Sequence, residues 1–309
     1  METRFLVTGS GGCIGAWTVA QLVHAGTPVV AFDASPDDHR LKLVLNDDEL
    51  ARLDRVTGDI TDLEALERTL DEHGITHVIH LAALQVPFCR ADPPLGARVN
   101  VVGTVNVFEA VARRSNMGRV VYASSVAAYD ALDESHPQAA MEGTPSTLYG
   151  VYKRANEGTA TVFAQERGVP STGLRPHTVY GPGRDQGLTS APTTAMLHAA
   201  ADLPYKLPFG GAYQLQYAPD VAKKFIEAAN RSTRYADLED IGGPVTHTDE
   251  VIEAITAAVP GAQITYERVV LPFPSETGDT TPATPLREGV ADAIARFRDL
   301  LDRGLVARP

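Results

Sequence analysis

A tyrosine and a lysine four residues apart could carry proton-transfer chemistry in this chain. Tyr149 and Lys153 form a Y-x-x-x-K pattern. Residues at i and i+4 share one face of a helix, so both side chains can point at one ligand. A phenol has a reference pKa of about 10 and is a poor acid or base at neutral pH, but a neighbouring ammonium group favours the phenolate and should lower that pKa. The same pattern is common on solvated helices, so by itself it also fits a plain surface helix.

A pair of serines stands upstream of this pattern, at the end of an apolar run. Arg119–Ala123 has the composition of a buried strand, and Ser124 and Ser125 follow at its carboxyl end. A hydroxyl group at such a strand end can polarise a substrate oxygen. The order of strand, serine pair and Y-x-x-x-K favours an active site over a solvated helix.

A glycine turn near the N-terminus indicates a second ligand. Thr8, Gly9, Gly12 and Gly15 form a T-G-x-x-G-x-x-G pattern, whereas G-x-G-x-x-G fails at Ile14. Glycines let the backbone turn tightly and approach a pyrophosphate, whose charge is favoured by the amides and dipole of the following helix. A glycine-rich stretch alone could be a plain loop. Its neighbours complete a βαβ unit, with a strand over Arg4–Thr8, a helix over Ala16–Ala25 and a strand over Val29–Phe32.

The second of these strands ends in an acidic residue, Asp33. A carboxylate at this place can accept hydrogen bonds from a ribose 2′-OH and repels a 2′-phosphate. NAD is therefore the expected cofactor, in preference to NADP. The glycine spacing resembles that of the short-chain dehydrogenase/reductase superfamily.

Composition argues against several function classes. Lys plus Arg number 27 and Asp plus Glu number 39, a net charge of −12 that argues against a nucleic-acid or anionic-membrane partner. Cys13 and Cys89, the only cysteines, offer no disulfide framework and fit a reducing cytoplasm. No secretory leader or membrane-spanning run is visible, and the nine histidines form no tight cluster with Cys or Asp, so no metal site is expected.

Strands and helices alternate through the first part of the chain. This alternation predicts an α/β fold, a doubly wound parallel sheet of the Rossmann type with ligands at the carboxyl ends of the strands. Beyond the first βαβ unit, the expected strands are Arg55–Ile60, His77–Ala83, Arg119–Ala123 and Pro170–Leu174. The expected helices are Asp47–Leu53, Asp62–His73, Asp92–Arg114 and Leu148–Glu166.

The alternation loosens after Arg175. We expect residues 1–175 to form the NAD-binding domain and residues 176–309 a smaller C-terminal substrate-binding region, with the chain crossing back into the first part around 215–245. The expected helices of this region are Pro192–Asp202, Asp220–Asn230, Thr248–Val259 and Pro285–Arg303, with short strands near Asp240 and Ile264. Pro272–Pro285, rich in Pro, Thr and Ser, predicts a long loop.

With these motifs the chain resembles the extended short-chain dehydrogenases, the NAD-dependent epimerase/dehydratase family that includes UDP-galactose 4-epimerase. The similarity runs from Thr3 to about Ala229 and more weakly to Leu301. The cofactor contacts that the motifs and the resemblance imply come from the glycine turn, the strand ends, one helix and one later turn. They are Gly9, Gly12, Cys13, Ile14, Gly15, Asp33, Asp59, Ile60, Leu81, Ala82, Ala83, Asn100, Tyr149, Lys153, Pro176, His177, Thr178 and Val179.

The resemblance also implies roles at the reacting end. Tyr149 would be the general acid/base, and Lys153 would hold the ribose and lower the phenol pKa. Ser125 lies four residues before Tyr129, as the family's catalytic serine precedes its tyrosine, so it is preferred to Ser124. The expected substrate contacts are Gln85, Ser125, Val126, Tyr149 and Arg184. Family members commonly form homodimers through the helices that correspond to Asp92–Arg114 and Leu148–Glu166.

The chain departs from the family pattern on the substrate side. Family dehydratases carry an Asp-Glu pair where Val126 and Ala127 stand, and neither of these can move a proton, so dehydration is not expected. Nucleotide-sugar enzymes usually have Asn where Thr178 stands, and their two diphosphate-holding arginines correspond to the stretches Tyr213–Gln216 and Glu276–Asp279. Each lost charge-assisted contact is worth roughly 1.5–3 kcal/mol. The sequence therefore predicts a substrate smaller than a UDP-sugar, although Arg184, Lys206 and Arg287 could compensate.

Three functions stay open at this point. The leading hypothesis is an NAD-dependent oxidoreductase or epimerase that transfers hydride at a secondary alcohol or ketone of a sugar-like small polar substrate. The second is a nucleotide-sugar 4-epimerase. The third is a non-catalytic NAD-sensing protein, which the presence of Ser125, Tyr149 and Lys153 disfavours because regulators of this superfamily have lost the tyrosine and lysine.

Overall fold

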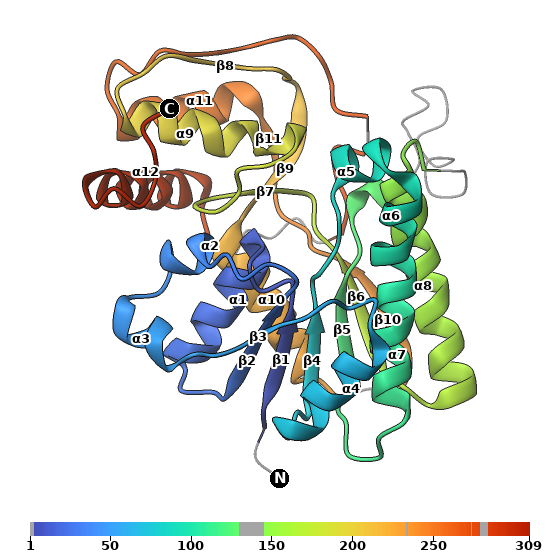
Figure 1. Cartoon of the computed structure of the whole chain (residues 1–309). Helices are drawn as coiled ribbons and strands as arrows, with labels where there is room; N and C mark the ends of the chain where they lie inside the picture. Colours follow the sequence, from blue (N-terminus) through green and yellow to red (C-terminus); the bar gives the residue numbers. More distant parts are fainter. Residues whose placement is uncertain (1–2, 130–144, 233, 273, 279–283) are drawn as a thin grey trace.

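The computed structural model describes residues 3–129, 145–232, 234–272, 274–278 and 284–309. Its centre is a seven-stranded sheet with strand order β10-β6-β5-β4-β1-β2-β3, in which every pair of neighbours is parallel (Figure 1). The strands are β1 Phe5–Thr8, β2 Val29–Asp33, β3 Asp54–Thr57, β4 His77–His80, β5 Val120–Ala123, β6 Ser171–Arg175 and β10 Ala236–Asp240. The predicted doubly wound parallel sheet is confirmed.

Helices cover both faces of this sheet because its central strands are apolar on both sides. Phe5 and Val7 of β1 pack in one core cluster with α1 and α10, whereas Leu6 between them packs in another with α4, α7 and α8. Figure 1 shows α7 and α8 side by side on the second face. These helices are α1 Cys13–His24, α4 Leu63–Glu72, α7 Gly103–Ala112, α8 Leu148–Arg167 and α10 Ala218–Ala229. Shorter helices on the way are α2 His39–Lys42, α3 Asp47–Arg52 and α5 Val86–Ala91.

The remaining elements form a third core beyond the carboxyl ends of the strands. Its helices are α9 Ala191–Ala200, α11 Thr248–Ala258 and α12 Leu286–Asp302, which gather together in Figure 1. Two small sheets accompany them, one of order β11-β9-β7 and one of order β12-β8. Their strands are β7 Thr178–Tyr180, β8 Tyr205–Leu207, β9 Ala212–Tyr217, β11 Val245–His247 and β12 Ile264–Tyr266. Between β9 and β11 the chain returns to the main sheet through α10 and β10.

The long helix expected over Asp92–Arg114 is interrupted. The structure has α6 at Pro93–Ala97, a π-helical turn η1 at Arg98–Val102 and then α7. A π-turn accommodates one extra residue and is often found at functional sites. Here it carries Asn100, whose side chain holds the loop after β4. Hydrophobic periodicity cannot show such a turn, because the valines continue through it.

Two strand predictions were too long at their carboxyl ends. β3 ends at Thr57 and β4 at His80, so Asp59, Ile60 and the residues Leu81–Ala83 lie in the loops that follow. Part of the loop expected at 272–285 lies outside the described residues. Within the part of the chain that the structure describes, no helix is long and apolar enough to cross a membrane, and no three His, Cys, Asp or Glu side chains form a metal-binding group.

Candidate active site

The glycine turn packs so closely on its neighbours that larger residues do not fit. Gly9 has φ +71°, and a Cβ on it would lie 2.5 Å from the Ala82 backbone nitrogen. A Cβ on Gly15 would lie 2.1 Å from the Gly9 carbonyl oxygen. Helix α1 begins at Cys13 with no side-chain cap and no acid in its first turn. Its first amides therefore face the turn unshielded, as binding of a pyrophosphate requires.

Asp33 lies where an adenosine ribose would meet the turn. Its Oδ2 accepts from the Gly11 amide at 2.9 Å, and its Oδ1 accepts from the Ser35 amide at 3.0 Å. A pocket of about 440 Å³ opens here, and Asp37 and Asp38 join Asp33 in its lining beside Arg55. Three carboxylates against one guanidinium make this pocket unfavourable for a 2′-phosphate.

Asp59 and Ile60 follow β3 in the next loop. The Asp59 carboxylate accepts from the Thr61 amide at 2.8 Å. Ile60 is buried, and its side chain fills the space beside Gly103 at the start of α7. The loop is thus fixed against the start of α7.

A buried hydrogen-bonded chain ties the glycine strand to the π-turn region. His80 Nδ1 lies 2.7 Å from Thr8 Oγ1, and its Nε2 lies 3.0 Å from Thr104 Oγ1. Burial, with a smaller effect of the Lys153 charge, lowers the His80 pKa to about 3. His80 is therefore a neutral core residue and not an acid/base. Asn100 accepts from the Leu84 amide at 2.7 Å and donates to the Leu84 carbonyl at 2.8 Å.

The structure brings the three expected catalytic residues together. Ser125 begins a short 3-10 turn, and its Oγ accepts from the Ala127 amide at 3.1 Å. Ser125 hydrogen-bonds Tyr149, and Lys153 Nζ lies 5.5 Å from the centre of the Tyr149 ring. The buried Lys153 ammonium also donates to the Ala123 carbonyl at 2.6 Å. The serine, the phenol and the ammonium thus meet at the carboxyl end of β5.

Two residues at the start of helix α8 position it beside Ser125, and neither was among the predicted site residues. Thr147 caps the helix, accepting from the Gly150 amide at 3.1 Å. A Cβ on Gly150 would lie 2.0 Å from the Ala127 carbonyl oxygen. Gly150 therefore lets Tyr149 approach Ser125, and a glycine directly after the tyrosine was the visible signal.

The direction of the Tyr149 pKa shift differs from the expectation. Burial raises the Tyr149 pKa, and the opposing effects come from the Ser125 hydrogen bond and the Arg184 charge, with no resolved effect of Lys153. Burial also lowers the Lys153 pKa to about 8. Burial therefore outweighs the groups that favour the phenolate, and the phenol pKa is raised where the sequence analysis expected it to be lowered.

Two of the expected substrate contacts, Gln85 and Arg184, lie beside Gly187. Arg184 donates to the Gln186 carbonyl at 2.7 Å and to Thr189 Oγ1 at 2.8 Å. A Cβ on Gly187 would lie 3.2 Å from Gln85 Oε1 and 4.0 Å from Arg184 Nη2. Gln85 and Arg184 therefore meet at this glycine, whereas Val126 is buried within the short 3-10 turn that Ser125 begins.

Beneath the serine turn lies an ionic network that the sequence analysis missed. Arg175 donates twice to Glu157 at 2.7 Å and once to Tyr129 Oη at 2.8 Å. Tyr129 donates to Asp240 on β10, and Ser124 donates to Glu157. The signal was available for Glu157, which follows Lys153 by four residues on the same helix face. Ser124 thus supports the turn from below, while Ser125 faces the phenol.

On the substrate side, two buried glutamines hold distant loops. Gln214 donates to the carbonyls of Gly243 at 2.7 Å and Thr277 at 2.9 Å, and its Oε1 accepts from the Thr277 amide at 3.1 Å. Gln216 accepts from the His177 amide at 2.8 Å and donates to the Ile241 carbonyl. The two stretches that correspond to the family's diphosphate-holding arginines are therefore hydrogen-bonded to each other through Gln214 and Thr277.

His177 belongs to this assembly. Its Nδ1 accepts from the Thr178 amide at 2.9 Å, and its Nε2 lies 2.8 Å from the Pro274 carbonyl. Burial lowers its pKa to about 4. It is a neutral positioning residue of the turn Pro176–Val179.

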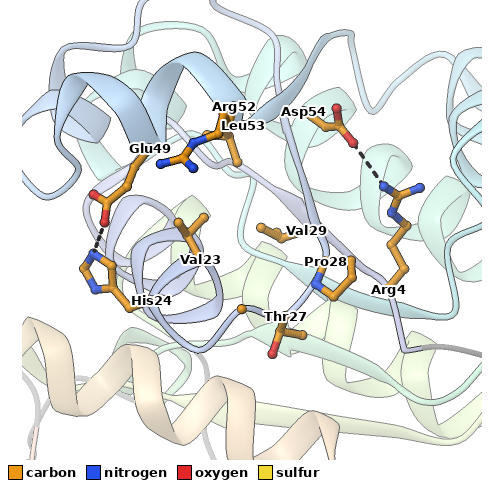
Figure 2. Close-up of a pocket in the computed structure, with 11 residues that line it drawn as sticks. Arg4, Val23, His24, Thr27, Pro28, Val29, Glu49, Arg52, Leu53 and Asp54 are labelled. Atoms are coloured by element: carbon orange, nitrogen blue, oxygen red, sulfur yellow. Dashed lines mark hydrogen bonds and ion pairs between the residues drawn. The ribbon is translucent and has the colours of Figure 1, made fainter.

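A second pocket, of about 540 Å³, lies at the opposite ends of β1 and β2 (Figure 2). Two polar pairs line it: Arg4 contacts Asp54 at 3.2 Å, and His24 Nε2 lies 3.3 Å from the Glu49 carboxylate. It contains none of the expected site residues. Ligands of open α/β sheets bind at the carboxyl ends of the strands, so we assign no role to this pocket.

Comparison with known proteins agrees with this geometry. The NAD dependent epimerase/dehydratase family model matches residues 5–239. UDP-glucuronate 4-epimerase 2 of Arabidopsis thaliana is 34% identical over 57% of this chain and 42% of its own length, so the chain spans less than half of that relative. UDP-glucose 4-epimerase of Mycolicibacterium smegmatis is 30% identical over 96% of this chain and 99% of its own length.

A solved structure, MoeE5 in complex with UDP-glucose and NAD, superposes with a TM-score of 0.74 at 28% identity, covering 96% of this chain and 99% of that one. The family model and these relatives confirm the resemblance found in the motifs, and with it NAD as the cofactor. The chain belongs to the NAD-dependent epimerase/dehydratase family.

Proposed function

We propose that this chain is an NAD-dependent oxidoreductase or epimerase that transfers hydride at a secondary alcohol or ketone carbon of a small, polar, sugar-like substrate. Bound NAD would supply the hydride acceptor. The glycine turn, the uncapped start of α1 and the Asp33 carboxylate fit its pyrophosphate and ribose.

The protein's own groups would handle the proton. Tyr149 would take the hydroxyl proton of the substrate on oxidation and return it on reduction. Ser125, hydrogen-bonded to Tyr149, would hold the reacting oxygen. Lys153, released from the Ala123 carbonyl, would bind the nicotinamide ribose and favour the phenolate.

The hydrogen bonds between Gln214 and Thr277 are the observation that favours a small substrate over a UDP-sugar. They join the two stretches where arginines would hold a diphosphate, and Gln214 is fully buried. A diphosphate placed there would face neutral groups whose hydrogen bonds are already made, in a protein of net charge −12. Lys206, one of the candidate compensating cations, already pairs with Glu267 at 3.1 Å.

A UDP-sugar 4-epimerase is the second candidate. The Mycolicibacterium relative is a UDP-glucose 4-epimerase that matches nearly the whole chain, and MoeE5 was solved with UDP-glucose. Arg184 is one cation that could serve a diphosphate here, since its charge acts on Tyr149.

Calorimetric titration of the NAD-loaded protein with UDP separates the two candidates. The small-substrate proposal expects no detectable binding at millimolar UDP. Micromolar binding would overturn it in favour of the UDP-sugar epimerase. Absorbance of reduced cofactor, followed with a panel of free sugars and sugar acids, then identifies the substrate, and silence of the whole panel with NAD bound would favour the NAD-sensing alternative.

We also propose that the chain acts as a homodimer. Large apolar side chains stand exposed along α6, η1 and α8, where the family commonly pairs: Leu95, Val102, Leu148, Val151 and Val162. Such a stripe is unfavourable in water. Light scattering at micromolar concentration should give about twice the monomer mass of 33.0 kDa, and a monomer mass would count against the pairing.

A further inference from the structure

The segment Gly181–Gly187 lies directly on the outer side of the glycine turn. The Trp17 indole donates to the Pro182 carbonyl at 3.0 Å, and Cys13 Sγ lies 3.9 Å from the same oxygen. A Cβ on Gly183, which has φ +89°, would lie 3.8 Å from Cys13 Cα. This loop follows β7, so a segment of the substrate side is fixed to the start of α1.

Arg40 joins this loop to the turn. Its Nε and Nη2 donate to the two carboxylate oxygens of Asp185 at 3.1 and 2.7 Å, and its Nη1 donates to the Gly11 carbonyl at 2.9 Å. The Arg40 side chain is only 14% exposed, whereas that of Asp185 is 48% exposed. Gly183 packs on the Arg40 stem, where a Cβ would lie 3.6 Å from Arg40 Cδ.

The position of the Arg40–Asp185 pair matters because Gly11, which contacts Arg40, also contacts Asp33, the carboxylate expected to bind the ribose. The Gly11 amide donates to Asp33, and the Gly11 carbonyl accepts from Arg40. One residue, Gly11, therefore lies between the carboxylate expected to bind the ribose and the guanidinium that holds the loop. A dinucleotide bound on the turn would have Arg40 and Asp185 along its edge.

Other charged groups near Asp185 do not replace Arg40. His39 Nε2 lies 3.7 Å from Asp185 Oδ2, but its Nδ1 lies 2.7 Å from the Asp37 carboxylate. Arg184 donates to Gln186 and Thr189. A bidentate arginine–carboxylate contact is the strongest of these by geometry.

We propose that Arg40 and Asp185 form a clasp that must open for NAD to enter and leave, and that it sets the rate of cofactor exchange. The inference rests on the proposed binding of NAD. A slow exchange keeps the reduced cofactor in place while a ketone intermediate turns over, as an epimerase requires. A fast exchange suits a dehydrogenase.

Stopped-flow fluorescence of NADH binding and displacement tests the clasp. Asp185→Asn and Arg40→Gln should each raise the dissociation rate about tenfold, equivalent to loss of one charge-assisted contact. The association rate should rise as well, because the loop no longer has to open. The double variant should match Arg40→Gln, since both single variants remove the Arg40–Asp185 contact and Arg40→Gln also removes the hydrogen bond to the Gly11 carbonyl.

Arg231→Gln is the matched control. It breaks an exposed ion pair with Glu239 (2.7 Å) and should leave both rates unchanged. Unchanged rates in Asp185→Asn, with NADH bound normally by the unaltered protein, would overturn the clasp alone. A faster dissociation in Arg40→Gln only, or without faster association, would also overturn it, because Arg40 would then contact NADH itself. Failure of the unaltered protein to bind NADH would overturn the proposed function and the clasp together.

Discussion

The parallel sheet and the region beyond it hold their polar groups in different ways. In the sheet, Asp33 and Ser125 stand at or just past strand ends, and each accepts a hydrogen bond from an amide two residues further along the chain. Beyond the sheet, Gln214 and Gln216 lie inside a small sheet and reach loops up to 63 residues away. Strand ends thus place the groups of the chemistry, while side-chain contacts between loops set the space for the substrate. Changes in the first region should alter rate and cofactor use, and changes in the second should alter stability and substrate choice.

Tyr149→Phe should have the largest effect. It removes one hydroxyl and almost no volume, so turnover should fall by roughly 10²–10⁴-fold with NADH affinity nearly unchanged. Tyr152→Phe is the matched control, because its hydroxyl donates to the Pro93 carbonyl, away from Ser125. Steady-state kinetics and fluorescence titration measure both quantities. A Tyr149→Phe variant that keeps most of its rate would refute the assignment of the acid/base.

Asp33→Asn should have an intermediate effect on cofactor choice. The unaltered protein should strongly prefer NAD to NADP. Removal of the carboxylate charge should lower the ratio of kcat/KM for NAD to that for NADP by about tenfold or more. Asp37 and Asp38 in the same pocket should keep some preference. The ratio of kcat/KM values for the two cofactors measures this, with Asp54→Asn at the opposite end of the sheet as control. Equal use of both cofactors by the unaltered protein would mean that Arg40 turns to the phosphate.

Gln214→Leu should have the smallest effect, and on stability rather than chemistry. It leaves the Gly243 carbonyl and the Thr277 amide without their buried partner, which costs roughly 1–3 kcal/mol. Thermal unfolding should move down by a few degrees, whereas the exposed Gln186→Leu should not shift it. NADH affinity should stay unchanged, and a loss of cofactor binding in Gln214→Leu would erase the distinction between the two regions.

The sequence predicted the parallel sheet and the meeting of Ser125, Tyr149 and Lys153 because those signals are local. A strand end, a glycine spacing and an i, i+4 pair are each visible within a few residues. The predicted direction of the Tyr149 pKa shift was wrong, because burial dominates this shift and burial depends on residues far apart in the chain. The contact of Gln214 with Thr277 was not predicted for the same reason. Even Glu157, at helical spacing from Lys153, acquires its partner Arg175 only through the fold.

The π-turn Arg98–Val102 gives the helix between α5 and α7 one residue more than a regular helix of the same length needs. Each residue of an α-helix turns the chain by about 100°. A π-turn absorbs its extra residue without changing the phase of the helices on either side. Deleting one residue here should therefore restore a regular helix and keep the relative orientation of α6 and α7, but remove the wide turn that carries Asn100. The hydrogen bonds of Asn100 to Leu84 should then be lost, so the deletion should damage the loop after β4 more than the packing of the helices.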